Sequence, residues 1–250
     1  MAADARALRW EALLNARDLG GLPSGAGPIA RGAIVRADAL YRLNDAGWAA
    51  LVAHGVRTII DMRNEKEVAA KPYRFDGDNG VVLAHIAQQT DEMWQSIPRP
   101  IDRVTFDTTM LELARSRFAS IAEAIAGAPE GGVLIHCEAG KDRTGLMTML
   151  LLDLVGTPVD VIAADYTLTA IGLAPLFADL IAKADTPERR ARLEEEALTR
   201  PEVMLAIHEV LRTRYGGAEP YLVSGGARPE SLARIRARML GLRNYTGASA

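Results

Sequence analysis

The segment at residues 136–145, HCEAGKDRTG, holds the only cysteine of the 250-residue chain, six positions before an arginine. A short apolar run (VLIHC) precedes the loop and a long one (TGLMTMLLLDLVG) follows it, which predicts a buried strand, a loop and a buried helix. Unpaired backbone N–H groups and the positive end of the helix dipole attract an anion at such a place. Arg143 can clamp a phosphate with two hydrogen bonds, and Lys141 adds a second positive charge.

The same positive field stabilises the ionised form of Cys137, which is the nucleophilic form of a thiol. Gly140 permits the tight turn that points successive N–H groups inward. Thr144 can donate its hydroxyl to the sulfur, and His136 is expected to order the loop. An isolated cysteine at the end of a strand is more often a small buried apolar residue. The spacing to the arginine, between a strand and a helix, instead favours phosphate binding joined to nucleophilic catalysis.

The composition of the chain argues against several other classes of function. The net charge is −3, about half of the residues are hydrophobic and 24% are charged, as in an ordinary globular protein. Scattered arginines and few aromatics argue against nucleic-acid binding. One cysteine excludes an intramolecular disulfide framework, and the four histidines lie too far apart in sequence for a metal site. We therefore expect no metal and no cofactor.

The chain shows no segment with the pattern of a targeting signal or a membrane span. The N-terminus, MAADARALRW, lacks the apolar run of a secretory signal. The most apolar stretch, Leu146 to Val155, is too short to cross a bilayer and contains Asp153. We predict a cytoplasmic protein without a membrane span, while export without a classical signal stays open.

Hydrophobic periodicity predicts strands followed by helices. Apolar runs predict a strand at 33–40 and buried strands at 56–63, 80–86 and 133–137. Helices are expected at 45–55, at 110–125 and after the loop, while prolines predict irregular structure from Ala87 to Thr105. The last third reads as helical, with proline just inside the start of segments beginning at Thr157, Thr186 and Arg200. In the first two, the threonine before the proline can cap the helix. This order predicts one α/β domain over residues 1–250, with an additional helical group.

The loop resembles the active-site signature HCxxGxxR[ST] of cysteine-dependent phosphatases. More narrowly, it is similar to the HCxAGKDRTG loop of a bacterial tyrosine-phosphatase-like family, whose members act on phosphotyrosine, often on phosphoserine or phosphothreonine, and on phosphoinositides. Further stretches follow the order of that family: NARDLGG (15–21), RADAL (36–40), IIDMR (59–63), ADYTLT (164–169) and YGGAEPYL (215–222). The resemblance implies a mostly parallel central β-sheet flanked by helices, with a helical lid at roughly 171–215.

The resemblance also implies roles for the loop residues. Cys137 would attack phosphorus and form a phosphocysteine intermediate, and Arg143 with the loop amides would hold the phosphoryl oxygens. The expected substrate-binding residues are Glu138, Ala139, Gly140, Lys141 and Thr144. The lysine resembles those of loops that handle phosphoinositides, so the expected partner is a phosphorylated protein or a phosphoinositide.

A leaving group needs a proton, and the resemblance implies Asp142 as the general acid. Asp91, Asp102 and Asp107 fall where a separate acid loop could lie, and we expect each to be a solvated carboxylate. Asp61, at the end of a predicted strand, is expected to support the loop.

Other chemistries fit these residues less well. A nucleotide-binding P-loop fails, because Asp142 replaces the magnesium-binding Ser or Thr and Ile135 replaces the first glycine. The match of GAGPIA (25–30) to a dinucleotide fingerprint has no preceding strand. A rhodanese-like sulfurtransferase also uses a loop cysteine, although its loop usually lacks the arginine. The non-enzymatic alternative is a catalytically silent phosphate-binding module.

Overall fold

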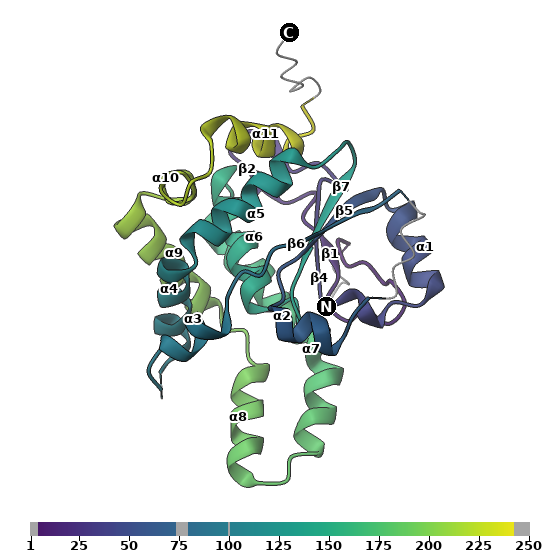
Figure 1. Cartoon of the computed structure of the whole chain (residues 1–250), viewed down its shortest axis with the longest axis vertical. Coiled ribbons are helices and arrows are strands. Elements are labelled where there is room, and N and C mark those ends of the chain that lie inside the picture. Colours follow the sequence, from purple (N-terminus) through teal and green to yellow (C-terminus); the bar gives the residue numbers. More distant parts are fainter. Residues whose placement is uncertain (1–4, 74–79, 100, 243–250) are drawn as a thin grey trace.

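A computed structural model describes residues 5–73, 80–99 and 101–242. Its centre is a five-stranded sheet in the order β1-β4-β7-β5-β6 (Figure 1). The strands are β1 (Arg17–Asp18), β4 (Ile34–Ala37), β7 (Gly132–His136), β5 (Val56–Asp61) and β6 (Val82–His85). Only the β1–β4 pair is antiparallel within this sheet. The predicted mostly parallel α/β sheet is therefore confirmed, and β7 lies at its centre.

Alternating side chains of β7 enter two separate cores, which explains why the strand is apolar throughout. Val133 and Ile135 belong to the larger core. Leu134 points to the other side, where it packs in a smaller core with Trp10 and Leu51. Because both faces of the strand are covered, its C-terminal end is held rigidly where the loop begins.

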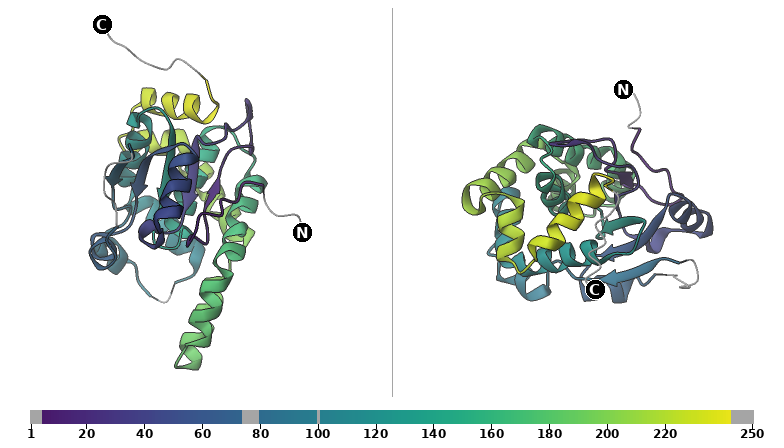
Figure 2. Two further views of the ribbon diagram at one scale, coloured as in Figure 1. Left: turned by 90° about the vertical axis from the view of Figure 1, so that its right-hand side faces the viewer. Right: turned by 90° about the horizontal axis from the view of Figure 1, so that it is seen from above.

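Helices cover both faces of the sheet (Figures 1 and 2). The smaller core is closed by the N-terminal segment and α1 (Asp45–Ala53). The larger core is closed by α5 (Arg115–Gly127), α6 (Asp142–Leu154) and the C-terminal helices. Shorter elements complete this part: the β2–β3 hairpin (Pro23–Ser24 and Gly27–Pro28), the 3-10 helix Leu40–Arg42, and α2 (Glu65–Ala70).

The last third is helical, as predicted. It holds α7 (Val159–Ala182), α8 (Pro187–Ala197), α9 (Pro201–Tyr215), α10 (Ala218–Ser224) and α11 (Pro229–Met239). Thr186 caps α8 and Pro187 takes its first turn, as expected. At α7 the expectation is wrong, because Pro158 itself is the N-cap. The C-terminal half of α7 and α8 lie side by side and project from the sheet (Figures 1 and 2).

Three local predictions need correction. The strand near 80–86 forms but is not buried: β6 is the edge of the sheet, and Val82 is 52% exposed. The stretch from Ala87 to Thr105 is not irregular, because α3 (Asp91–Ser96) and the start of α4 (Arg103–Leu113) lie in it. Their N-caps, Thr90 and Asp102, supplied the missed signals. The expected helix at 110–125 is divided between α4 and α5 at Ala114.

Within the described ranges, α7 is the one helix long and apolar enough to cross a membrane. A third of its apolar window, 33%, is buried inside the protein. The absence of a membrane span, the cytoplasmic location and the single-domain organisation stay predictions.

Candidate active site

Cys137 lies directly after β7, and α6 begins five residues later at Asp142. Its side chain is 2% exposed and belongs to the larger core. The hydroxyl of Thr144, in the first turn of α6, donates a hydrogen bond to Sγ at 3.1 Å. The sulfur is thus held at the N-terminal end of a buried helix, where the helix dipole and a hydroxyl donor stabilise negative charge.

Gly140 shapes the loop between these elements. Its φ is +64°, and a Cβ atom there would lie 2.4 Å from the carbonyl oxygen of Ala37. The Gly140 carbonyl accepts hydrogen bonds from Arg36 at 2.8 Å and from the side-chain amide of Asn15 at 3.0 Å. Any larger residue would push the loop off this support, so the glycine is required by close packing as well as by its backbone angle.

Asp165 of α7 fixes the arginines behind the loop. Its carboxylate accepts from Arg36 at 2.8 Å, Arg17 at 3.0 Å and Arg6 at 2.7 Å. Burial raises the pKa of Asp165, but Arg17 and Arg36 outweigh it and hold the pKa well below its ordinary value. The contact joins α7, β1 and β4 under the loop, so the NARDLGG and ADYTLT stretches meet in space.

Replacing Asp165 by asparagine is expected to lower the free energy of unfolding by about 3 kcal/mol, because buried guanidiniums lose their counter-ion. Since the folded pKa lies below the ordinary 3.8, this stabilisation is present above that pH and is lost as the pH falls below it. Urea unfolding at pH 7 measures the effect. Asp160→Asn, at an exposed position of the same helix, is the matched control. Equal stability of the two variants would contradict the prediction.

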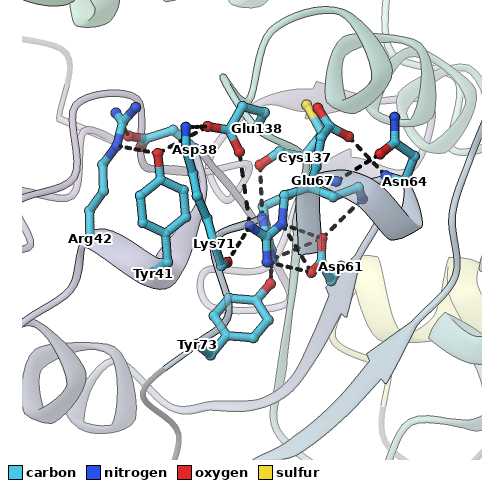
Figure 3. Close-up of polar contacts among 12 residues, drawn as sticks. Asp38, Tyr41, Arg42, Asp61, Asn64, Glu67, Lys71, Tyr73, Cys137 and Glu138 are labelled. Carbon is cyan, nitrogen blue, oxygen red and sulfur yellow. Dashed lines mark hydrogen bonds and ion pairs between the residues drawn. The ribbon is translucent and has the colours of Figure 1, made fainter. Parts of the chain in front are cut away.

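Arg143 is paired with a glutamate that the sequence analysis missed. Its two terminal nitrogens bind the two carboxylate oxygens of Glu67 at 2.5 and 2.6 Å. Burial lowers the pKa of Arg143, but Cys137 and Glu67 outweigh it and raise the pKa above its ordinary value. Glu67 is itself held by the capping box of α2, in which it exchanges hydrogen bonds with Asn64 (Figure 3). The guanidinium is therefore oriented before any substrate binds.

Asp142 lies in the first turn of α6 with its side chain 29% exposed. Its Oδ1 accepts from the Tyr166 hydroxyl at 3.2 Å, and its Oδ2 lies 3.2 Å from Arg103. It is thus a partly exposed carboxyl beside the loop, which is the placement that proton transfer to a bound group needs.

The other three aspartates have different surroundings. Asp91 forms an ion pair with Lys66, and Asp102 is the exposed N-cap of α4. Asp107 contradicts the prediction of a solvated carboxylate, because it is buried and paired with Arg103 through two hydrogen bonds. Burial raises the pKa of Asp107 to about 6 against the opposing effect of Arg103.

The remaining loop side chains point in different directions. Lys141 is buried and donates to the Glu196 carbonyl at 2.5 Å, at the end of α8. Glu138 instead accepts from Lys71 at 2.7 Å and from the Tyr41 hydroxyl at 2.9 Å (Figure 3). Lys141 thus links the active-site loop to the projecting helices.

His136 and Asp61 lie beneath the loop, next to each other at the ends of β7 and β5. The His136 ring contacts the Cys137 carbonyl oxygen through Nδ1 at 2.9 Å and the Tyr73 hydroxyl through Nε2. Burial lowers the pKa of His136 despite the opposing effect of Asp61, so the imidazole is neutral at pH 7. Asp61 accepts hydrogen bonds from the Arg63 guanidinium at 3.1 and 3.0 Å. These contacts suit an ordering role.

A cleft of about 570 Å³ lies between the loop and the C-terminal helices. Ala139, Lys141 and Asp142 line it from the loop, with aromatic walls from Trp94, Phe106, Tyr166 and Phe177. Glu196 and nearby residues of α8 and α9 close the far side, and the helical lid at roughly 171–215 stays a prediction. In the described part of the chain, no group of three or more His, Cys, Asp or Glu residues could hold a metal ion.

The structure thus brings Cys137, Asp142, Arg143 and Thr144 together, with His136 and Asp61 below them. Sequence reasoning missed Glu67, Arg103 and the support from Arg36. A signal for Glu67 was present in NEKE (64–67), a capping box directly after a buried strand.

Comparison with known proteins also indicates a phosphatase. A tyrosine phosphatase family model matches residues 8–241. A tyrosine-protein phosphatase of Nostoc commune is 32% identical over 83% of this chain and 74% of its own length. The triple specificity protein phosphatase PtpB of Mycobacterium tuberculosis is 29% identical over 84% of this chain and 91% of its own.

One solved structure, P. aeruginosa TpbA in complex with phosphotyrosine, aligns over 80% of this chain and 98% of that one, with 15% identity and a TM-score of 0.36. Neither the family match nor the two relatives support a sulfurtransferase or a silent binding module. With the family model spanning nearly the whole chain, this protein belongs to the tyrosine phosphatase family and is a phosphatase.

Proposed function

We propose that this phosphatase hydrolyses phosphotyrosine through a phosphocysteine intermediate on Cys137. The observation that carries the proposal is the position of Sγ, at the N-terminus of α6 and 3.1 Å from the Thr144 hydroxyl. The sulfur attacks phosphorus, while Arg143 and the loop amides hold the phosphoryl oxygens. Thr144 stabilises the thiolate when it leaves in the second step.

Asp142 is the proposed general acid. Its partly exposed carboxyl lines the cleft beside the loop, and Tyr166 and Arg103 fix its orientation. It gives its proton to the oxygen of the leaving group as the sulfur–phosphorus bond forms. The buried Asp107, held on both oxygens by Arg103, is less accessible to a substrate.

Asp142→Asn is expected to slow a phosphoserine peptide by about 10²–10⁴-fold, and p-nitrophenyl phosphate much less, because an alkoxide needs a proton more than a nitrophenolate does. Steady-state kinetics on both substrates measure the difference. Asp91→Asn, which alters a rival aspartate paired with Lys66, is the control and should leave both rates unchanged. Equal losses on both substrates in Asp142→Asn would remove it as the acid.

Phosphotyrosine is the proposed first substrate because aromatic side chains line the cleft next to the loop. Phosphoserine, phosphothreonine and phosphoinositides are proposed as further substrates, supported by the similarity to the triple specificity phosphatase. Lys141 would balance the additional charge of an inositol lipid only after releasing the Glu196 carbonyl. A kinetic panel of the three phosphopeptides with mono- and bis-phosphorylated inositol lipids tests the order of preference.

A further inference from the structure

Arg99 follows α3 and lines the large cleft beside the active-site loop. Its guanidinium carbon lies 4.1 Å from the centroid of the Trp94 ring and 4.9 Å from that of the Phe106 ring. In the described part of the chain, no hydrogen bond or ion pair reaches its side chain. Two aromatic faces therefore hold the charge in place, while the N–H donors stay available to a ligand.

The other cations that line this cleft are already occupied. Each of them is paired within the protein: Arg103 with Asp107 and Asp142, Lys141 with the Glu196 carbonyl, and Arg200 with Glu195. Among the described residues that line the cleft, Arg99 is thus the cation left without an acidic or carbonyl partner.

The rings that hold Arg99 also reach the surroundings of the catalytic loop. Trp94 and Phe106 line a second hollow, of about 170 Å³, which Asp142 and Arg143 border as well. The same two rings and Asp142 also line the large cleft. One pair of aromatic rings therefore joins the space next to the proposed phosphate clamp to the free guanidinium of Arg99.

We propose that Arg99 binds an acidic side chain close to the phosphotyrosine of a peptide substrate, an inference that rests on the proposed function. A guanidinium presents parallel N–H donors that match the two oxygens of a carboxylate. Stacking on Trp94 and Phe106 orders the side chain before the substrate binds, so less conformational entropy is lost on binding. Arg99 would thereby select acidic phosphorylation sites among possible substrates.

A single free cation suits a carboxylate better than a second phosphate. A phosphate monoester carries a charge of about −1.5 to −2 at pH 7, so one guanidinium balances only part of it. The carboxyl groups of Asp102, Glu195 and Glu196 line the same cleft and repel additional negative charge. These charges favour an acidic peptide over the head group of a bis-phosphorylated inositol lipid as the ligand of Arg99.

Pairs of phosphotyrosine peptides that differ in one side chain test the inference. Each pair carries either Glu or Gln at one of the four positions on either side of the phosphotyrosine. At the position that reaches Arg99, Glu is expected to raise the wild-type kcat/KM about tenfold over Gln. In Arg99→Met, which keeps an unbranched side chain next to Trp94, this ratio should fall to about one. The ratio cancels any general change in phosphoryl transfer, because both peptides meet the same variant.

Arg200→Met is the matched control, because Arg200 lines the same cleft but is paired with Glu195. The control should keep the wild-type ratio of Glu to Gln peptides at the same position. Both arginines are exposed, so thermal unfolding should show that both variants are folded.

Three results would overturn the inference. The first is a wild-type enzyme without a preference for Glu at any position, or an unchanged preference in Arg99→Met. The second is an equal loss of preference in Arg200→Met, which would indicate the net charge of the cleft. The third is a loss in Arg99→Met confined to bis-phosphorylated inositol lipids, relative to mono-phosphorylated ones, which would assign Arg99 to a lipid phosphate. If the wild type hydrolyses no phosphotyrosine peptide at all, the proposed function fails first, and the two failures are thereby distinguished.

Discussion

Cys137→Ser is expected to lower the turnover of p-nitrophenyl phosphate by at least about 10⁴-fold, because a serine hydroxyl is not ionised at neutral pH and needs a base. The nearest imidazole does not supply one. His136 is directed to the Cys137 carbonyl oxygen and to the Tyr73 hydroxyl. The loop amides and Arg143 are unchanged in the variant, so phosphate affinity should stay within about threefold of wild type.

Two measurements check this result. Steady-state assays give the turnover, and calorimetric titration with phosphate gives the affinity. Because Cys137 is the only cysteine, iodoacetamide should inactivate the wild type with one label per chain and should not label the variant. If the serine variant kept about a tenth of wild-type turnover, another group would be the nucleophile.

Arg143→Lys is expected to lower kcat/KM by about 10³-fold, because a lysine replaces a planar two-pronged donor with a single point charge. The substitution keeps the positive charge, but the ion pair with Glu67 makes the loss of kcat/KM larger than the unchanged charge would suggest. Glu67 holds both terminal nitrogens of the arginine and is itself fixed by the α2 capping box. A lysine can satisfy only part of that geometry, and its ammonium is drawn toward Glu67.

The matched control for this variant is Arg236→Lys. Arg236 makes a similar two-pronged pair with Glu219, remote from the loop. Steady-state kinetics should therefore show a wild-type kcat/KM for the control, and thermal unfolding should show both variants folded. Comparable activity of Arg143→Lys and wild type would mean that charge alone suffices, and the proposed phosphate clamp would be wrong.

Much of the secondary structure around the loop could be predicted from the sequence, because each strand and helix has its own local pattern of apolar residues. The apolar run before Cys137 is buried on both faces of the sheet, and the run after it forms the buried helix α6. Such patterns depend on residues close in sequence. A segment that is apolar on every side must be buried on every side, so its place in the core can be predicted without knowing its neighbours. The edge strand β6 shows where this fails, since an apolar run does not reveal whether a neighbouring strand exists beyond it.

The candidate site was readable only in part. Cys137, Asp142, Arg143 and Thr144 lie within eight residues, so their proximity follows from the chain itself. The partners of these groups lie far away in sequence. Glu67 is 76 residues from Arg143, and nothing local indicates that α2 delivers its carboxylate there.

Asp107 illustrates the same limit. Its sequence neighbours suggested a solvated carboxylate, yet α4 buries it against Arg103 and beside the active-site loop. The charge state of a carboxyl depends on the solvent and the charges that the whole fold places around it. Sequence spacing carries no information of that kind.

The sequence by itself determined the chemistry: a thiol, an arginine and a carboxyl on one loop between a buried strand and a buried helix. Only the tertiary structure decided which distant groups orient that loop, with Asp165 and Arg36 beneath it and Glu67 on the arginine. The reason is physical, since backbone geometry fixes neighbours along the chain while packing alone brings separate elements into contact.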